Sequence, residues 1–160
     1  MVNTDNGIVA QGMTNALVQD RFEEAYQPFR EKHLGSKILV VDDEPEIVLA
    51  LSMRLKAAGY QVITAGDGIE ATKKAIHECP DLILLDIGMP CGDGHTVANR
   101  LSSSVSTILV PIIYLTARTS PVDRDRALAL GAYDYITKPF TPERLLNSVK
   151  NALNGIRIEG

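Results

Sequence analysis

The stretch SKILVVDDEPEI, residues 36–47, sets a run of aliphatic residues directly against three acids and a proline. Ile38 to Val41 are β-branched or aliphatic throughout, which is typical of a strand buried on both faces of a sheet. Asp42 and Asp43 follow at once, although neighbouring carboxylates repel each other and low dielectric disfavours their charged forms. Two costly charges at the end of a buried strand point to a functional role.

Four further strand-like runs follow, each separated from the next by a segment of helical period. The predicted strands are 37–42 (KILVVD), 61–65 (QVITA), 81–86 (DLILLD), 111–116 (PIIYLT) and 133–137 (YDYIT). The predicted helices are a segment ended by Gly59, 68–79, a segment from near Gly94, 121–131 and 141–155. Five such units predict a doubly wound, flavodoxin-like (βα)5 α/β fold, with a five-stranded parallel sheet of order 2-1-3-4-5 and helices on both faces.

Length and composition fit one such domain with additional chain at its ends. We assign 1–35 to an N-terminal extension, partly helical or flexible, 36–154 to the domain and 155–160 to a short tail; a linker within a longer protein is the alternative for the extension. The net charge of −4 gives no sign of a surface for nucleic acid or anionic membranes. No run approaches the ~18 apolar residues that cross a bilayer, and the two cysteines lack metal-ligand spacing. We therefore expect a cytoplasmic protein that binds neither membrane nor, directly, nucleic acid.

Five polar residues stand at the carboxyl ends of the predicted strands, where open parallel sheets bind their ligands. They are Asp42, Asp43, Asp86, Thr116 and Lys138. Three clustered carboxylates require a cation, and a ligand set made only of oxygens favours Mg²⁺. A hydroxyl and an ammonium beside them suit the oxygens of a phosphoryl group. This edge of the sheet is therefore the predicted functional site.

Four motifs with these residues, VVDDEP, LLDIGMP…DG, YLTA and YITKPF, occur in order along the chain. Together they resemble the signature of the receiver domain of two-component response regulators, over roughly residues 36–154. The resemblance implies that Asp86 is the phosphoacceptor, a carboxylate nucleophile that takes a phosphoryl group from a phosphohistidine. It also implies that Asp43, Asp86 and the main-chain carbonyl of Gly88 ligate Mg²⁺, with Asp42 acting mostly through water.

The same resemblance assigns roles to the later motifs. Thr116 is expected to donate a hydrogen bond to the phosphoryl oxygens and Lys138 to form an ion pair with them. Tyr135 resembles a switch aromatic that turns inward once Thr116 moves; the alternative is an ordinary surface tyrosine on an edge strand. The Lys138–Pro139 peptide bond is expected to be cis. Gly88 and Arg118 occupy the positions where this family tunes loss of the phosphoryl group.

Partners and output follow from the resemblance as well. The donor is expected to be a histidine kinase or a His-phosphotransfer protein, and the output a downstream protein target or a homodimer. The family signals through the surface of helix 121–131, strand 133–137 and helix 141–155. That surface is expected to carry Arg124, Arg126, Asp134, Tyr135 and Lys150. No effector domain follows within these 160 residues, so we expect a protein that acts on a partner or a piece of a longer chain.

Two other functions use similar features. A Mg²⁺-dependent phosphohydrolase-like enzyme on a similar α/β fold would use the same acids, but it needs a substrate pocket and usually a second acid as general acid or base. A nucleotide or flavin binder is disfavoured, because the chain contains neither G-x-x-x-x-G-K-[ST] nor G-x-G-x-x-G. The sequence therefore favours a phosphorylation-dependent signalling switch, whose own chemistry is limited to self-phosphotransfer and autodephosphorylation.

Overall fold

The computed structural model describes residues 35–89, 94–117 and 119–155; the predictions for residues 1–34 and 156–160 lie outside this part of the chain. Strands and helices alternate along it, as the sequence predicts. The strands are β1 (Lys37–Val41), β2 (Gln61–Ala65), β3 (Leu82–Asp86), β4 (Ile112–Thr116) and β5 (Asp134–Thr137). The helices are α2 (Pro45–Ala57), α3 (Gly68–Glu78), α4 (Gly94–Ser102), α5 (Pro121–Ala129) and α6 (Pro142–Leu153). None of these helices has the length and apolar character that a membrane span requires.

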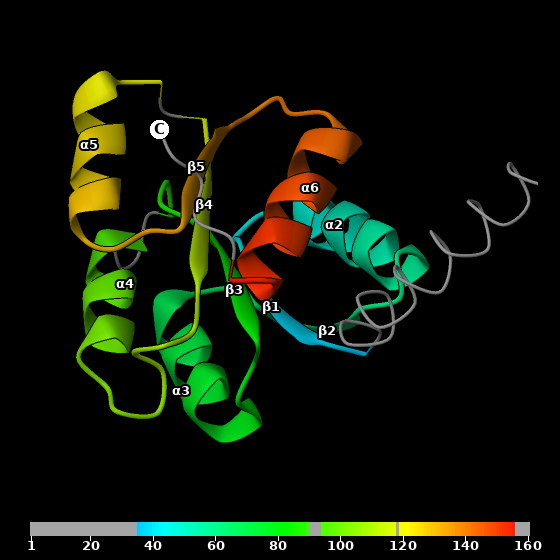
Figure 1. Ribbon diagram of the computed structural model, residues 1–160, viewed down its shortest axis with the longest axis horizontal. Coiled ribbons are helices and arrows are strands. Elements are labelled where there is room, and N and C mark those ends of the chain that lie inside the picture. Colours follow the sequence, from blue (N-terminus) through cyan, green and yellow to red (C-terminus); the bar gives the residue numbers. More distant parts are fainter. Residues whose placement is uncertain (1–34, 90–93, 118, 156–160) are drawn as a thin grey trace, which may run out of the picture. The chain divides into compact units, whose positions relative to one another are not determined.

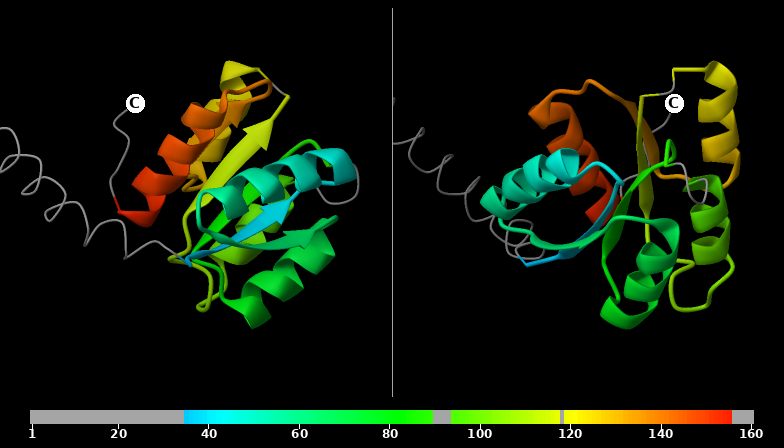
Figure 2. Two further views of the ribbon diagram at one scale, coloured as in Figure 1. Left: turned by 90° about the vertical axis from the view of Figure 1, so that its right-hand side faces the viewer. Right: turned by 180° about the vertical axis from the view of Figure 1, so that it is seen from behind.

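The five strands form one parallel sheet in the order β2-β1-β3-β4-β5, which confirms the predicted topology. The chain moves outward from β1 to β2, and then across β1 to β3 and onward to β5. Helices α2 and α6 cover one face of the sheet, while α3, α4 and α5 cover the other (Figures 1 and 2). The direction of winding reverses at β1 and β3, so the carboxyl ends of these strands open onto the crevice where such sheets bind ligands.

Two hydrophobic cores lie on the two faces of the sheet, because successive residues of a strand point to opposite sides. In β1, Leu39 and Val41 belong to the core beneath α3, α4 and α5, whereas Ile38 and Val40 belong to the core beneath α2 and α6. All four side chains are at most 1% exposed. The aliphatic run before the two acids is thus buried on both faces, as its composition predicts.

Gly94 fixes the start of α4 against the end of β3. A Cβ atom at this position would lie 2.6 Å from Cα of Ile87 and 2.8 Å from the carbonyl oxygen of Asp86, closer than real Cβ contacts. Glycine is needed here because backbone approaches backbone, and not because of a left-handed conformation. The contact places the first turn of α4 directly beside the strand end that carries Asp86.

Candidate functional site

Three acids meet at the carboxyl edge of the sheet, as predicted. Asp42 and Asp43 follow β1, and Asp86 is the last residue of β3. One carboxylate oxygen from each lies within 4.8 Å of those of the other two. Asp42 and Asp86 are buried, and Asp43 is exposed. These oxygens form a donor set that fits a hard divalent cation open to solvent on one side.

Lys138 reaches this cluster from the loop after β5. Its Nζ donates a hydrogen bond to Oδ2 of Asp42 at 2.7 Å and lies 3.6 Å from Oδ2 of Asp86. Oδ1 of Asp42 accepts a hydrogen bond from the backbone N–H of Glu44 at 2.9 Å. The ammonium group therefore binds two of the three acids and partly offsets the charge that gathers at the strand ends.

The net electrostatic effect on Asp86 is unfavourable for its charged form. Burial raises the pKa of this carboxyl group above its ordinary value, and the charges of Asp42 and Asp43 raise it further. The backbone N–H of Gly88 and the charge of Lys138 lower the pKa, but they do not outweigh burial. The charged form of Asp86 is therefore destabilised by burial and by the neighbouring acids, and a bound cation would stabilise it.

Gly88 lies against the carboxylate of Asp86 and has no side chain that could cover it. Its backbone N–H donates a hydrogen bond to Oδ1 of Asp86 at 2.8 Å. A Cβ atom at Gly88 would lie 3.2 Å from that oxygen, so even alanine would crowd it. Arg118, the other position expected to tune the phosphoryl group, lies outside the described residues.

Thr116 and Lys138 are joined through the main chain at the ends of β4 and β5. Thr116 is fully buried, and its carbonyl oxygen accepts a hydrogen bond from the backbone N–H of Lys138 at 2.7 Å. The Lys138–Pro139 peptide bond is cis, which confirms the prediction. The structure thus brings all five predicted strand-end residues to one edge of the sheet.

Tyr135 is a core residue and not a surface tyrosine. Its side chain is 7% exposed and belongs to the core beneath α3, α4 and α5. The expectation that Tyr135 and Asp134 contribute to the surface is therefore wrong. Asp134 is 8% exposed. It alternates with Tyr135 along the strand and so points to the opposite face, toward α6.

Asp134 accepts hydrogen bonds from the backbone N–H of Tyr135 and from the side chains of Arg144 and Ser148, two residues that no sequence motif marks. Arg144 on α6 binds both carboxylate oxygens, with Nη1 2.7 Å from Oδ2 and Nη2 3.0 Å from Oδ1. The hydroxyl of Ser148 donates to Oδ2 at 2.5 Å and the N–H of Tyr135 to Oδ1 at 2.7 Å. Burial raises the pKa of Asp134, but these bonds outweigh it and hold the pKa below its ordinary value. The network ties α6 to the backbone of Tyr135.

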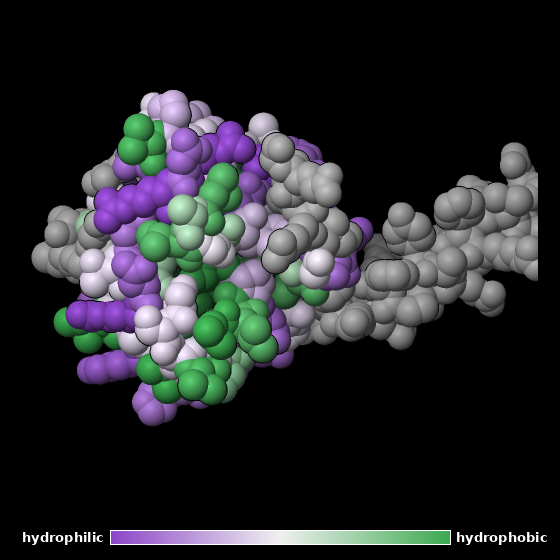
Figure 3. Space-filling view, turned by 60° about the vertical axis from the view of Figure 1, so that its left-hand side comes forward, coloured by the Kyte–Doolittle hydropathy of each residue, from purple (hydrophilic) through white to green (hydrophobic). Residues whose placement is uncertain are grey.

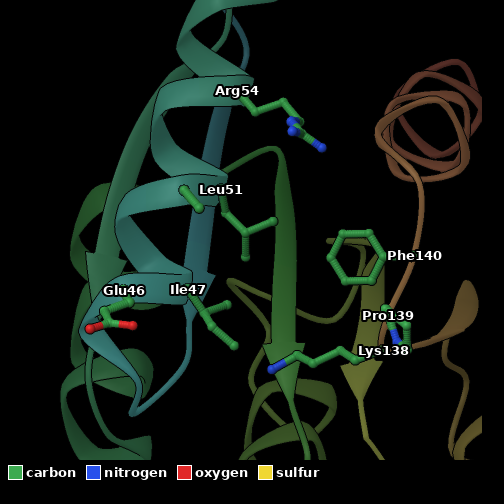
Figure 4. A pocket seen from close by; sticks show the side chains of 8 residues that line it. Glu46, Ile47, Leu51, Arg54, Lys138, Pro139 and Phe140 are labelled. Carbon is green, nitrogen blue, oxygen red and sulfur yellow. The ribbon is translucent and has the colours of Figure 1, made fainter.

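A groove of about 550 Å³ lies next to the acid cluster, between α2 and the loop after β5. Lys138 lines both the groove and the cluster. Apolar side chains line most of the groove, and charged ones stand at its margins (Figure 4). The lining residues are Glu46, Ile47, Ala50, Leu51, Arg54, Lys138, Pro139 and Phe140. Any large molecule that approaches Asp86 from this side therefore passes over an apolar surface.

Comparison with curated proteins finds regulators of transcription. Over 120 residues, the chain is 48% identical to the alkaline phosphatase synthesis transcriptional regulatory protein PhoP of Bacillus subtilis, covering 75% of this chain and 49% of that protein. It is 41% identical over 116 residues to the transcriptional regulatory protein KdpE of Mycobacterium tuberculosis, covering 72% of this chain and 50% of that protein. The chain thus spans about half the length of these relatives.

Solved structures with the same fold cover the domain almost completely. The chemotaxis protein CheY4 of Vibrio cholerae superposes with a TM-score of 0.71 at 36% identity, over 74% of this chain and 98% of that one. The receiver domain of the sensor histidine kinase PA1611 of Pseudomonas aeruginosa, whose active-site cleft coordinates a magnesium ion, has a TM-score of 0.70 at 32% identity, over 75% and 98%. The model of the response regulator receiver domain matches residues 38–150, and this chain belongs to that family.

Proposed function

We propose that this chain is a phosphorylation-dependent switch in which Asp86 accepts a phosphoryl group. The observation that carries the proposal is the position of the Asp86 carboxylate. It lies among two further acids, the Lys138 ammonium and the buried strand end of Thr116, at the crevice edge of the sheet. The raised pKa of Asp86 supports the proposal as well, because perturbed carboxyl groups concentrate at functional sites.

The transfer replaces one phosphorus bond with another. An oxygen of Asp86 attacks phosphorus, and the bond from phosphorus to the donor breaks; the donor leaves as imidazole from a phosphohistidine or as acetate from acetyl phosphate. Asp43, Asp86 and the carbonyl of Gly88 would hold Mg²⁺, with Asp42 acting through water. When bound, this ion supplies positive charge that offsets the phosphoryl oxygens. Lys138 would pair with those oxygens, and Thr116 would donate a hydrogen bond to one of them.

Acetyl phosphate with Mg²⁺ tests the acceptor directly. Intact-mass measurement should show one added phosphoryl group on the wild type and none on Asp86→Asn, because an amide does not attack phosphorus. Asp125→Asn is the matched control, since Asp125 lies exposed on α5, and it should be labelled like the wild type. Labelling of the Asp86→Asn variant would show that another residue accepts the phosphoryl group. Turnover of acetyl phosphate much faster than labelled Asp86 loses its phosphoryl group would favour a phosphohydrolase instead.

We also propose that the protein donor, a histidine kinase or His-phosphotransfer protein, docks on the groove beside Lys138. The donor's histidine must reach Asp86, and the apolar lining next to the acids offers contact area for the flank of a helix. Leu49 and Met53, on the same helix α2, are 62% and 65% exposed. They enlarge the apolar surface that a donor could cover.

Ala50→Arg separates docking from chemistry. Ala50 is exposed and lines the groove, so a long side chain there would fill it. Transfer from a phosphorylated His-phosphotransfer protein should slow at least tenfold, while labelling by acetyl phosphate stays unchanged. Ala57→Arg, at the other end of α2 and outside the groove, is the matched control and should slow neither reaction. Equal rates for both variants with the protein donor would place docking elsewhere.

The output surface that we propose is formed by α5, β5 and α6. With α5 and α4 brought forward, Figure 3 shows hydrophilic and hydrophobic side chains interspersed over this side. Arg124 and Arg126 are exposed on α5, near Val122, which is 74% exposed. Such a surface suits a protein target in the cytoplasm or a second copy of the chain. Sedimentation velocity with and without beryllofluoride decides between them, because only the second copy changes the mass of the purified protein.

A further inference from the structure

Three aromatic rings form a continuous row inside the core, from β5 across β4 to α4. The rings of Tyr135 and Tyr114 meet edge to face, with centroids 6.5 Å apart and planes at 78°. The rings of Tyr114 and His95 meet in the same way, at 5.9 Å and 89°. Tyr114 is 1% exposed and His95 is 2% exposed, so both are enclosed by protein. Each ring therefore limits the positions that its neighbour can take.

The row follows from the strand register. Tyr114 and Tyr135 are direct partners on the parallel strands β4 and β5, so their side chains lie on the same face of the sheet. His95 is the second residue of α4 and comes directly after Gly94, whose close contact with Asp86 fixes the helix start. His95, at one end of the row, thus belongs to the helix start that packs against the backbone of Asp86. Tyr135, at the other end, is the residue expected to act as the switch.

We propose that Tyr114, backed by His95, holds the ring of Tyr135 in its buried position before any phosphoryl group is present. This inference goes beyond the proposed function, and it departs from the expectation that Tyr135 turns inward only once Thr116 moves. Tyr114 and His95 are positioning residues, because they act on Tyr135 and touch no reacting atom. An edge-to-face aromatic pair shifts an equilibrium by about 2- to 13-fold beyond its burial. Phosphorylation of Asp86 should then change the solvent exposure of the Tyr135 ring little, because the ring is already buried.

The solvent exposure of the Tyr135 ring tests this proposal. Tyrosine is labelled with ¹³C, the Tyr135 signal is assigned with Tyr135→Phe, and relaxation by a soluble gadolinium chelate is measured with and without Mg²⁺ and beryllofluoride. In the wild type, relaxation of this ring should be slow in both states and differ less than twofold between them. Tyr133, which is partly exposed, is the internal comparator and should relax several-fold faster.

Three variants separate positioning from a merely structural role. Tyr114→Leu should raise relaxation at Tyr135 several-fold without beryllofluoride, and beryllofluoride should lower it again. Tyr114→Phe keeps the ring and should behave like the wild type. His95→Leu removes only the outer ring and should give a smaller change in the same direction. Melting curves identify any variant that fails to fold, and His95→Leu then carries the test.

Two results would overturn the inference. One is a wild-type Tyr135 ring that relaxes as fast as Tyr133 before beryllofluoride is added. The other is a folded Tyr114→Leu or His95→Leu variant whose Tyr135 stays as protected as in the wild type. Intact mass after acetyl phosphate, measured on the same samples, shows separately whether Asp86 accepts the phosphoryl group. The two proposals can therefore fail independently of each other.

Discussion

Replacing Lys138 by methionine removes the ammonium group from the acid cluster while keeping an unbranched apolar side chain of similar reach. Lys138 binds Asp42 at 2.7 Å, where the two side chains are 15% and 2% exposed, and it lies 3.6 Å from Asp86. Removing one partner of a buried ion pair typically costs about 3–5 kcal/mol. Because Asp43 is exposed, water reaches this edge, and we expect the low end, about 3 kcal/mol. For a domain of this size that loss lowers the melting temperature by about 10 °C.

The loss should depend on metal and on pH. Millimolar Mg²⁺ should raise the melting temperature of Lys138→Met more than that of the wild type, because the cluster has lost its own cation. The pKa of Asp86 is already raised, and it rises further once the charge of Lys138 is gone. The share of the lost unfolding free energy that comes from Asp86 is therefore fully present at pH values above the raised pKa of Asp86 in the variant. This share shrinks as the pH falls through that pKa, because a protonated Asp86 needs no cation beside it.

Urea unfolding in metal-free buffer, from neutral to acid pH, measures these effects. Lys73→Met is the control, because Lys73 is exposed on α3, and it should stay within about 0.5 kcal/mol of the wild type. A Lys138→Met variant that loses no more than this control would refute the reasoning. An equal response of variant and wild type to Mg²⁺ would show that Lys138 does not offset the charge of the acids.

Three further predictions concern the acids and the backbone around them. Asp43→Ala should weaken stabilisation by Mg²⁺ and raise the metal-free melting temperature, because it relieves repulsion within the cluster; a lower metal-free value contradicts this. Gly94→Ala should cost about 1–3 kcal/mol and slow labelling of Asp86 by acetyl phosphate, whereas Gly66→Ala, whose Cβ would meet nothing nearer than 4.0 Å, should do neither. Asp134→Asn should cost about 2 kcal/mol at neutral pH in urea unfolding, because it removes the charged acceptor of the hydrogen bonds from Arg144. Since the folded pKa of Asp134 is lowered, that difference should shrink as the pH falls below the ordinary value of 3.8; a constant difference excludes a charged network.

The sequence by itself determined the fold and the membership of the site. Aliphatic runs of strand length, alternating with segments of helical period, leave few arrangements other than a parallel sheet covered on both faces. Because parallel strands carry their carboxyl ends to one edge, the residues that follow each run share a site wherever the strands lie in the sheet. Asp42, Asp86, Thr116 and Lys138 were therefore predictable from their place after a strand, without any distance being known.

Only the tertiary structure decided which groups oppose one another within that site and beneath it. The ammonium of Lys138 binds Asp42 more closely than Asp86, a choice set by the path of the loop after β5. Asp134 and Tyr135 are adjacent in sequence, but the strand sends one to Arg144 and Ser148 on α6 and the other to Tyr114. A charged residue before an aromatic one at an edge strand is typical of a surface. The positions of α6 and α4 bury both residues here, and helix packing over a twisted sheet is decided by contacts between residues far apart in the chain.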